Sequence, residues 1–283
     1  MSHLQFQVKI PHERIAVFEE MLGDTIESLW WDEEGNITGI ISQEKKVEFQ
    51  NRFQSLFSQD NQRLPEMQFA EMDNRDWLEE DQQLLQPTEV ENFFLYPPHY
   101  VGEIPQGKIS FKIDSPHAFG SGHHETTKSC LLALHELSKD FKISNALDVG
   151  CGSGILAMAI ASLWNVPVYA TDIDAKSVET TLQNIEENGL EDIHVVESQG
   201  LDHEFISAQA PFDLIVANIH SEPLKELSPI IMRSITGRGK VVLSGILNEQ
   251  EEDVVEVYSN HGFKLMKRYP EGQWSTLLFT VKI

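Results

Sequence analysis

A glycine-rich segment near the middle of the chain has the composition of a ligand-binding turn. It reads DVGCGSG, follows an apolar run that ends at Val149, and precedes a second apolar run with helical spacing. Gly150, Gly152 and Gly154 can adopt backbone angles that other residues avoid, and they let a ligand approach the main chain closely. The start of a helix adds unpaired N–H groups and a positive dipole end, which suit a carboxylate or a phosphate. We therefore predict that this turn holds one end of a ligand.

An acidic residue follows the turn at the distance typical of a ribose-binding site. Asp172 lies near the end of the apolar run VYATDID, 22 residues after Gly150. At this spacing in a strand–turn–helix–strand unit, a carboxylate accepts hydrogen bonds from ribose hydroxyls. A nucleoside triphosphate loop is excluded, because no Gly-Lys-Ser or Gly-Lys-Thr follows the glycines. The pattern predicts a ligand that contains a ribose.

Two features favour S-adenosylmethionine over a nicotinamide dinucleotide as that ligand. The glycines follow the spacing GxGxG, whereas the dinucleotide fingerprint is GxGxxG. The chain also ends in two apolar runs, GFKLMKRYP and QWSTLLFTV, which predict an antiparallel hairpin that is foreign to the usual dehydrogenase sheet. We expect the methionine carboxylate to lie at the start of the helix. A nicotinamide-dependent oxidoreductase and a cofactor-binding module without turnover remain alternatives.

Two further segments supply polar groups to the same site. The run FDLIVAN has the composition of a buried strand and ends in Asn218. Its amide would lie at the carboxyl edge of the sheet, where such folds bind ligands. The segment HAFGSGHHETT ends in Thr126 and Thr127, either of which could reach the cofactor from above. The neighbouring His123, His124 and Glu125 do not predict a metal site, because adjacent residues point in different directions and no further ligands have a recognisable spacing.

The first part of the chain predicts a small separate domain. Apolar–polar alternation over residues 4–10 indicates a half-buried strand, and apolar residues recur at helical spacing in PHERIAVFEEMLGD and SQEKKVEFQNRFQSLF. With two further strands expected over 25–41 and one over 66–73, the order is βαββαβ. This order is typical of an α+β, ferredoxin-like sheet with two helices on one face. We predict this domain over residues 1–73.

A connection over residues 74–105 leads to a second domain over residues 106–283. The connection contains an expected helix, NRDWLEEDQQLLQP, and exceeds the usual length of a flexible loop, so we expect it to pack on the following domain. Beyond it, near-continuous apolar strands alternate with helical patterns, as in a parallel sheet that is buried on both faces. This alternation predicts an α/β fold, a Rossmann-like doubly wound sheet closed by the antiparallel hairpin at its edge.

The charge and composition of the chain limit its classes of partner. The 283 residues carry a formal net charge of −24, which repels phosphate backbones, so we expect no direct contact with nucleic acid. No uninterrupted apolar stretch approaches about 18 residues, so we expect no membrane span. No basic segment precedes an apolar block at the start, so we expect no secretory signal. The two cysteines, Cys130 and Cys151, form neither a disulfide framework nor a zinc site, and a cytoplasmic protein is expected.

Taken together, the motifs resemble those of the ribosomal protein L11 methyltransferases, within the class I S-adenosylmethionine-dependent methyltransferase superfamily. The resemblance covers essentially the whole chain and is carried by NRDW, HAFGSGHHETT, LDVGCGSGILAMA, ATDIDAKSVETTLQN, FDLIVANI and LSGIL. It implies that the cofactor is S-adenosylmethionine and that its contacts are Thr127, Gly150, Asp172 and Asn218, to which we add Gly152 of the same turn. It also implies methyl transfer to amines of ribosomal protein L11, either lysine side chains or the N-terminal amine.

Two departures from the family pattern lie where the target amine should enter. The family's loop reads FGTGTHPTT, so His123 and Glu125 replace a Thr and a Pro here, and HSEP follows the Asn-Ile pair where the family continues with Leu-Ala. A different protein or a small amine therefore remains an alternative substrate. The candidate residues on the acceptor side are Asn218 and His220, with Glu222 as a further candidate base. No metal is expected, since methyl transfer to a neutral amine requires none.

Overall fold

The chain folds into two compact units, which divide between Gln83 and Leu84. The computed structural model describes residues 3–11, 14–26, 28–31, 35–58, 64–72, 86–114 and 125–282. The helix expected over 74–87 falls almost wholly outside the described residues, and the predicted domain bounds of 1–73, 74–105 and 106–283 stay predictions. No helix within the described part of the chain is both long and apolar enough to cross a membrane.

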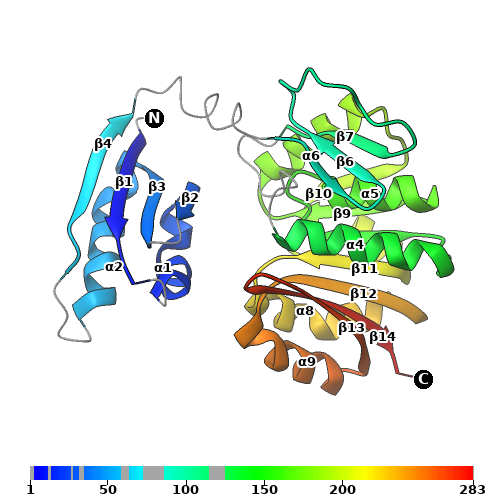
Figure 1. The fold of residues 1–283 in the computed structure, drawn as a ribbon. Helices are drawn as coiled ribbons and strands as arrows, with labels where there is room; N and C mark the ends of the chain where they lie inside the picture. The colour runs from blue at the N-terminus through cyan, green and yellow to red at the C-terminus, as the bar shows by residue number, and fades with distance from the viewer. Residues whose placement is uncertain are drawn as a thin grey trace. The chain divides into compact units, whose positions relative to one another are not determined.

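The N-terminal unit is a four-stranded antiparallel sheet with two helices (Figure 1). Its strands and α-helices in chain order are β1 (His3–Lys9), α1 (Ile15–Leu22), β2 (Ser28–Trp31), β3 (Asn36–Ser42), α2 (Lys46–Ser58) and β4 (Met67–Met72). The strands lie in the order β2-β3-β1-β4. Phe6 of β1 contacts Phe18 of α1 and Phe49 of α2, with ring centroids 6.2 and 4.6 Å away, so both helices cover the same face of the sheet.

The C-terminal unit is built on a seven-stranded sheet. Its strands are β8 (Ala146–Val149), β9 (Val168–Asp172), β10 (Ile193–Glu197), β11 (Phe212–Asn218), β12 (Ile235–Leu247), β13 (Phe263–Glu271) and β14 (Trp274–Val281). Their order is β10-β9-β8-β11-β12-β14-β13, with parallel pairing from β10 to β12 and antiparallel pairing of β14 with both of its neighbours. The Rossmann-like sheet and its terminal antiparallel hairpin, both predicted from the sequence, are confirmed.

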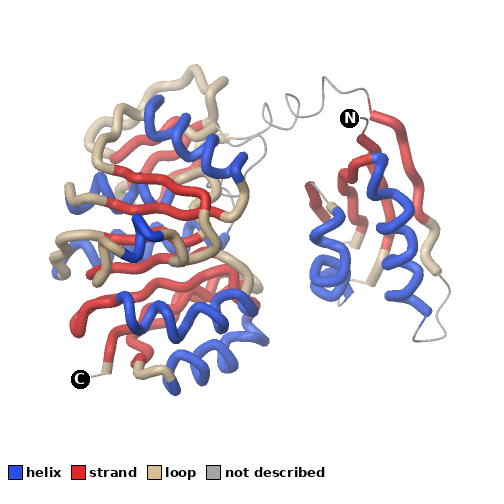
Figure 2. The backbone as a smooth tube through the Cα atoms, turned by 180° about the vertical axis from the view of Figure 1, so that it is seen from behind, coloured by secondary structure: helices blue, strands red, loops and turns tan. Residues whose placement is uncertain are grey.

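Helices cover both faces of this sheet, because its central strands alternate between two apolar cores (Figure 2). In β11, Leu214 and Val216 belong to one core, whereas Ile215 and Ala217 belong to the other. Three helices complete the first core, namely α4 (Glu125–Asp140), α5 (Ile155–Trp164) and α6 (Ala175–Glu187). The second core is completed by α7 (Glu204–Ser207), α8 (Ser221–Ser234) and α9 (Glu251–Asn260).

A small three-stranded sheet packs on the first core. It consists of β5 (Thr88–Val90), β6 (Phe93–Tyr96) and β7 (Ile109–Lys112). The side chains of Phe93, Leu95 and Phe111 are buried in the same cluster as residues of α4 and α5. The sequence prediction that the connection packs on the following domain is therefore confirmed for its described residues.

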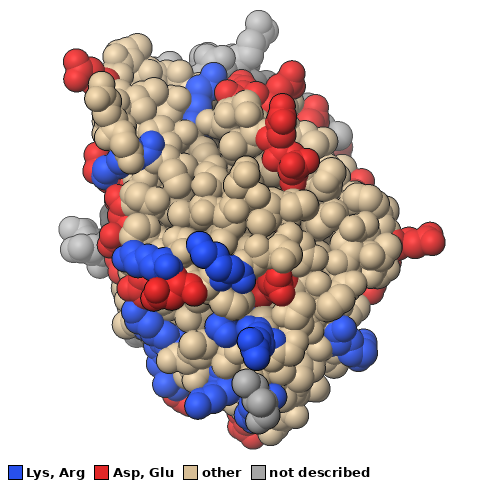
Figure 3. Space-filling model, turned by 90° about the vertical axis from the view of Figure 1, so that its right-hand side faces the viewer, with Lys and Arg blue, Asp and Glu red and all other residues tan. Residues whose placement is uncertain are grey.

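Basic side chains gather at one end of the C-terminal unit, although the chain as a whole is acidic. On the face shown in Figure 3, Lys and Arg concentrate over the lower part and Asp and Glu over the upper part. Arg238 and Lys240 lie near the beginning of β12, Lys264 near the beginning of β13, and Lys282 directly after β14. These strand ends lie at the edge of the sheet opposite Asn218, so these four cations stand away from the predicted site.

A glycine in β12 leads to a prediction about stability. Gly245 has a φ of +80°, and a Cβ atom there would lie 2.3 Å from the backbone oxygen of Ile219. Gly107 has nearly the same φ, +81°, but no atom within 4 Å of the corresponding position. We expect Gly107→Ala to cost about 1 kcal/mol through the strained backbone alone. Gly245→Ala should cost about 3 kcal/mol or more, because the clash adds to the same strain.

Urea denaturation of both variants measures the difference in the free energy of unfolding. Gly107→Ala is the matched control for the backbone strain. Equal losses in the two variants would contradict the packing described for Gly245.

Candidate functional site

Three of the predicted site residues follow or end adjacent strands. The chain winds from β8 through β9 to β10 in one direction, and then from β11 to β12 in the other. The strands β9, β8 and β11 are therefore neighbours whose carboxyl ends meet at the point where the winding reverses. Asp172 ends β9, Gly150 follows β8, and Asn218 ends β11. Such a switch point is where open α/β sheets bind their ligands.

The glycine turn is fastened to the end of β9 by its backbone. The N–H groups of Gly150 and Cys151 both donate to the Thr171 carbonyl oxygen, at 2.8 and 3.0 Å. Gly150, Gly152 and Gly154 have φ values of +74°, +56° and +81°, a region that favours glycine. At Gly150 a Cβ atom would also lie 2.4 Å from Cγ2 of Ile219. Backbone angle and packing together therefore require a glycine at this position.

The Asp172 carboxylate is held in place by two backbone N–H groups. Its Oδ2 accepts from Gly152, which is 2.9 Å away, and its Oδ1 accepts from Asp174, at 3.0 Å. Each carboxylate oxygen can accept a second hydrogen bond, so the group remains able to bind hydroxyls. The chain thus presents an oriented, half-buried carboxylate beside the glycine turn. This arrangement fits the ribose-binding role predicted for Asp172.

Buried polar atoms without protein partners line the same edge of the sheet. Among the described residues, the hydroxyl of Thr127, the amide oxygen of Asn218 and the Oδ1 atom of Asp148 are buried and make no hydrogen bond. Buried polar atoms are nearly always paired, so such exceptions indicate a missing partner such as a ligand or a water. Two of the three belong to residues selected from the sequence, whereas the hydroxyls of Ser110 and Thr171, which are also buried without a partner among the described residues, were not selected. The Asn218 amide oxygen accepts hydrogen bonds and the Thr127 hydroxyl can accept or donate, so these atoms fit a ligand with both hydroxyl and amine groups, as S-adenosylmethionine has.

A buried network of hydroxyl groups fixes the start of α4 against the sheet. The Ser129 hydroxyl lies 2.6 Å from that of Thr276 in β14, which lies 2.5 Å from that of Ser244 in β12. Ser244 pairs with Asn218 across the two strands, and Thr127 lies in the first turn of α4. The network thus ties the helix that carries Thr127 to the strand beside Asn218. Sequence reasoning missed it, although hydroxyls inside the apolar runs LSGIL and WSTLLF were a signal.

Asp148 caps α5 from within the sheet. Gly154, the N-cap residue of α5, has no side chain to bind the first turn, and Oδ2 of Asp148 accepts from the N–H of Ala157 instead, at 3.0 Å. Burial raises the pKa of the Asp148 carboxyl to about 7, and the negative charge of Asp172 adds to this rise. Sequence reasoning missed this residue, although an acid within the apolar run ALDVG was a signal.

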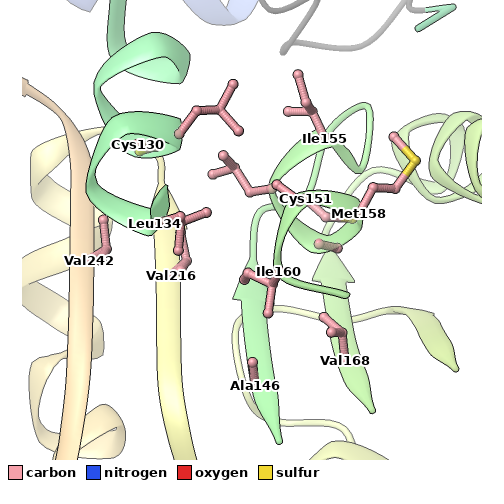
Figure 4. Close-up of a cluster of buried hydrophobic side chains, with 14 of the residues drawn as sticks. Cys130, Leu134, Ala146, Cys151, Ile155, Met158, Ile160, Val168, Val216 and Val242 are labelled. Atoms are coloured by element: carbon pink, nitrogen blue, oxygen red, sulfur yellow. The ribbon is translucent and has the colours of Figure 1, made fainter. Parts of the chain in front are cut away.

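The two cysteines serve the core. Cys130 and Cys151 are 0% and 5% exposed, and Figure 4 shows them near Leu134 and Ile155 in the first apolar core. Burial raises the pKa of the Cys130 thiol to about 12 and raises that of Cys151 further. A thiol must ionise to act as a nucleophile, so neither cysteine has the environment of a reactive one.

The candidate residues on the acceptor side are less firmly held. His220 precedes α8, its side chain is exposed, and it makes no capping hydrogen bond to that helix. Glu222 forms an ion pair with Lys225. His123 and His124 lie outside the described residues, whereas Glu125 is the first residue of α4. His220 is therefore not oriented by a bond to α8, Glu222 is paired with a lysine of its own helix, and the role of each as a base stays a prediction.

The raised pKa of Asp148 predicts how stability depends on pH. Between about pH 4 and pH 7 the folded chain keeps a proton on Asp148 that the unfolded chain has released, so the group's contribution to stability falls as the pH rises. At about 1.4 kcal/mol per unit of pKa, the loss is at most about 4 kcal/mol and is complete just above pH 7. Asp148→Asn keeps an oxygen for the Ala157 N–H and removes the proton.

Urea denaturation of the wild-type chain and of Asp148→Asn, at pH 5 and at pH 8, tests this dependence. The variant should gain stability relative to the wild type between the two pH values. The two chains differ only at position 148, so the comparison isolates the contribution of that side chain. A stability difference that is the same at both pH values would contradict a raised pKa at Asp148.

Comparisons with known proteins agree with this geometry. A family model described as ribosomal protein L11 methyltransferase (PrmA) matches residues 6–282. The ribosomal protein L11 methyltransferase of Brucella abortus (strain S19) is 37% identical over 211 residues, which cover 74% of this chain and 74% of that protein. Its counterpart from Caulobacter sp. (strain K31) is 37% identical over 203 residues, or 72% of this chain and 70% of that protein.

A solved structure extends the likeness to three dimensions. The crystal structure of the ribosomal protein L11 methylase from Lactobacillus delbrueckii subsp. bulgaricus matches with a TM-score of 0.63 and 28% identity. The match covers 70% of this chain and 100% of that one. The resemblance inferred from the motifs is thereby confirmed, and the chain belongs to the ribosomal protein L11 methyltransferase family.

Proposed function

We propose that the chain transfers methyl groups from S-adenosylmethionine to amines of ribosomal protein L11, on lysine side chains or at the N-terminus. One observation carries the proposal. In a member of this methyltransferase family, an oriented carboxylate, a glycine turn and buried unpaired polar atoms converge at the switch point of the sheet. The names of the related proteins support L11 as the substrate.

Different residues of the site would bind different parts of the cofactor. Asp172 would accept hydrogen bonds from the ribose hydroxyls, and the glycine turn with Gly150 and Gly152 would hold the methionine end. Ile173, which follows Asp172 directly and is 70% exposed, offers an apolar surface to the adenine. The buried oxygens of Thr127 and Asn218 would find in the cofactor the hydrogen-bond partners that they lack among the described residues. Ile173 was not predicted from the sequence.

The acceptor amine must be neutral before it can react. Bound S-adenosylmethionine supplies an electrophilic methyl group, but a lysine ammonium has no lone pair and an ordinary pKa near 10.4. Removal from water favours the neutral amine. The amide oxygen of Asn218 would accept an N–H of that amine and orient its lone pair, and His220 is the candidate proton acceptor. Orientation of this kind can lower a barrier by roughly 7–11 kcal/mol.

The N-terminal unit is proposed to recruit the protein substrate. Its βαββαβ order, with both helices on one face, supports a ferredoxin-like domain over residues 1–73, joined by a linker over 74–105 to a catalytic domain over 106–283. Residues 1–90 contain 19 acidic and 7 basic residues, a net charge of −12. Such a surface attracts a basic ribosomal protein. We place the activity in the cytoplasm, where ribosomal proteins are made.

The proposed role of Asp172 predicts a loss of cofactor affinity on its removal. Asp172→Ala removes a charged acceptor of two hydrogen bonds, each worth about 1.5 kcal/mol or more. We expect the Kd for S-adenosylmethionine to rise by about 100-fold in isothermal titration calorimetry. Asp174→Asn is the control, because it removes the same charge two residues away and keeps an oxygen for the cap of α6. Unchanged affinity in a folded Asp172→Ala chain would remove the ribose assignment.

The proposed substrate predicts one labelled product in a mixture. Incubation of the chain with total ribosomal protein and S-adenosylmethionine carrying a labelled methyl group should label L11, and mass spectrometry should find the added methyl groups on its amines. The Asp172→Ala chain serves as the negative control. Labelling of another protein would replace L11 as the substrate. Cofactor binding without any label would instead support a binding module that has lost turnover.

A further inference from the structure

The helix that follows Asp172 holds two successive carbonyl groups of the glycine turn. The Thr181 hydroxyl donates to the carbonyl oxygen of Gly152, and the side-chain amide of Asn184 donates to that of Ser153, both at 2.8 Å. Thr181 and Asn184 lie three residues apart on α6 and are both 0% exposed. Residues three apart share one face of a helix, so a single face of α6 binds the turn.

The Asn184 amide also binds the chain that leaves β7. Its Oδ1 accepts from the backbone N–H of Asp114 at 3.0 Å, and its Nδ2 donates to the Asp114 carbonyl oxygen at 2.9 Å. The side chain therefore pairs with Asp114 as a neighbouring strand would. Together with the bond to Ser153, these contacts use both donors and one acceptor position of the amide. Asn184 thus cross-links two segments of chain, 39 residues apart, through one buried group.

These contacts set the direction of the peptide groups in the turn. In a trans peptide, the C=O of one residue and the N–H of the next point in opposite directions. Because the Gly152 carbonyl is bound to Thr181, the N–H of Ser153 faces away from α6. The N–H of Gly152 is meanwhile bound to Asp172. The shape of the turn that would receive the methionine end therefore depends on hydrogen bonds from α6 as well as on its glycines.

A second asparagine, the C-cap residue of α6, makes the same kind of contact without touching the turn. Asn188 binds the backbone N–H and C=O of Lys112, both at 2.8 Å. It lies one helical turn beyond Asn184 and also donates to the Asn184 backbone oxygen, at 2.7 Å. Among the described residues its side chain binds Lys112, Met158 and Asn184, and none of these belongs to the glycine turn. Asn188 therefore separates the general effect of anchoring β7 from any specific effect on the turn.

We propose that Asn184 is a positioning residue for cofactor binding, which holds the glycine turn in the shape that receives the methionine end of the cofactor. It acts through its hydrogen bond to the Ser153 carbonyl oxygen, and its two hydrogen bonds to the backbone of Asp114 hold the amide in place. The inference rests on the proposed use of S-adenosylmethionine. Asn184 should strengthen the binding of the methionine half of that ligand. It should not affect the binding of the nucleoside half, which Asp172 holds.

Two ligands and two matched variants test this assignment. The Kd values for S-adenosylmethionine and for adenosine are measured by calorimetry on the full-length wild-type chain, on Asn184→Ala and on Asn188→Ala. Asn184→Ala should weaken S-adenosylmethionine by about tenfold, the effect of about one lost hydrogen bond, and leave adenosine within twofold. Asn188→Ala should leave both values within twofold. A merely structural role would weaken both ligands together.

The outcomes separate this inference from the proposed function. If the wild-type chain binds no S-adenosylmethionine, the proposed function fails and the inference fails with it. If the wild type binds and Asn184→Ala weakens both ligands equally, or neither, only the inference is overturned. The same holds if Asn188→Ala weakens S-adenosylmethionine as much as Asn184→Ala does.

A second variant keeps the test decisive if Asn184→Ala does not fold, which thermal unfolding would reveal. Thr181→Val preserves the volume of the side chain and releases the neighbouring Gly152 carbonyl. It should show the same selective loss of S-adenosylmethionine affinity, with adenosine unchanged. Unchanged affinity for S-adenosylmethionine in folded Thr181→Val would overturn the proposal that α6 shapes the turn.

Discussion

The site depends on how the end of β9 satisfies the backbone of the glycine turn. A buried N–H group without an acceptor is costly, and the successive N–H groups of Gly150, Cys151 and Gly152 in this turn all need one. The Thr171 carbonyl accepts two of them, and the Asp172 carboxylate accepts the third. The strand that supplies the proposed ribose ligand therefore also fixes the turn that would hold the other end of the cofactor. The distance between the two halves of the site follows from these hydrogen bonds.

Around this constraint, the hydroxyls that fix α4 to the sheet pair with one another, whereas two oxygens of the proposed site have no partner among the described residues. The hydroxyls of Ser129, Ser244 and Thr276 satisfy one another beneath the start of α4. A few residues away, Thr127 and Asn218 keep buried oxygens without a partner among the described residues, at a cost of about 1–3 kcal/mol each. A fold with two large apolar cores can carry this cost, and a bound ligand would remove it.

The sequence was sufficient to predict the doubly wound sheet and to place Asp172 and Asn218 at the ends of its strands. The strands are apolar on both faces, the winding of a doubly wound sheet brings their carboxyl ends together, and Asp172 and Asn218 end two of them. Hydrogen bonds between distant segments could not be predicted in this way. The bond from Asn184 to Asp114 spans 70 residues, and nothing in the local pattern distinguishes a buried asparagine from a solvated one. The role of Asp148 was not predicted because the run ALDVG was assigned to a buried strand from its apolar residues alone.

The glycines of the turn are the clearest case in which a sequence motif has a different physical cause from the one that it suggests. A motif of this kind is usually explained by the close approach of a ligand, but at Gly150 and Gly154 the protein itself leaves no room. A Cβ atom would meet Ile219 at the first position and Thr181 at the second, at 2.4 and 2.7 Å. Both glycines would therefore be required even if nothing were bound. The glycine motif identifies the fold, and the choice of ligand must come from the groups around the turn, Asp172, Thr127 and Asn218.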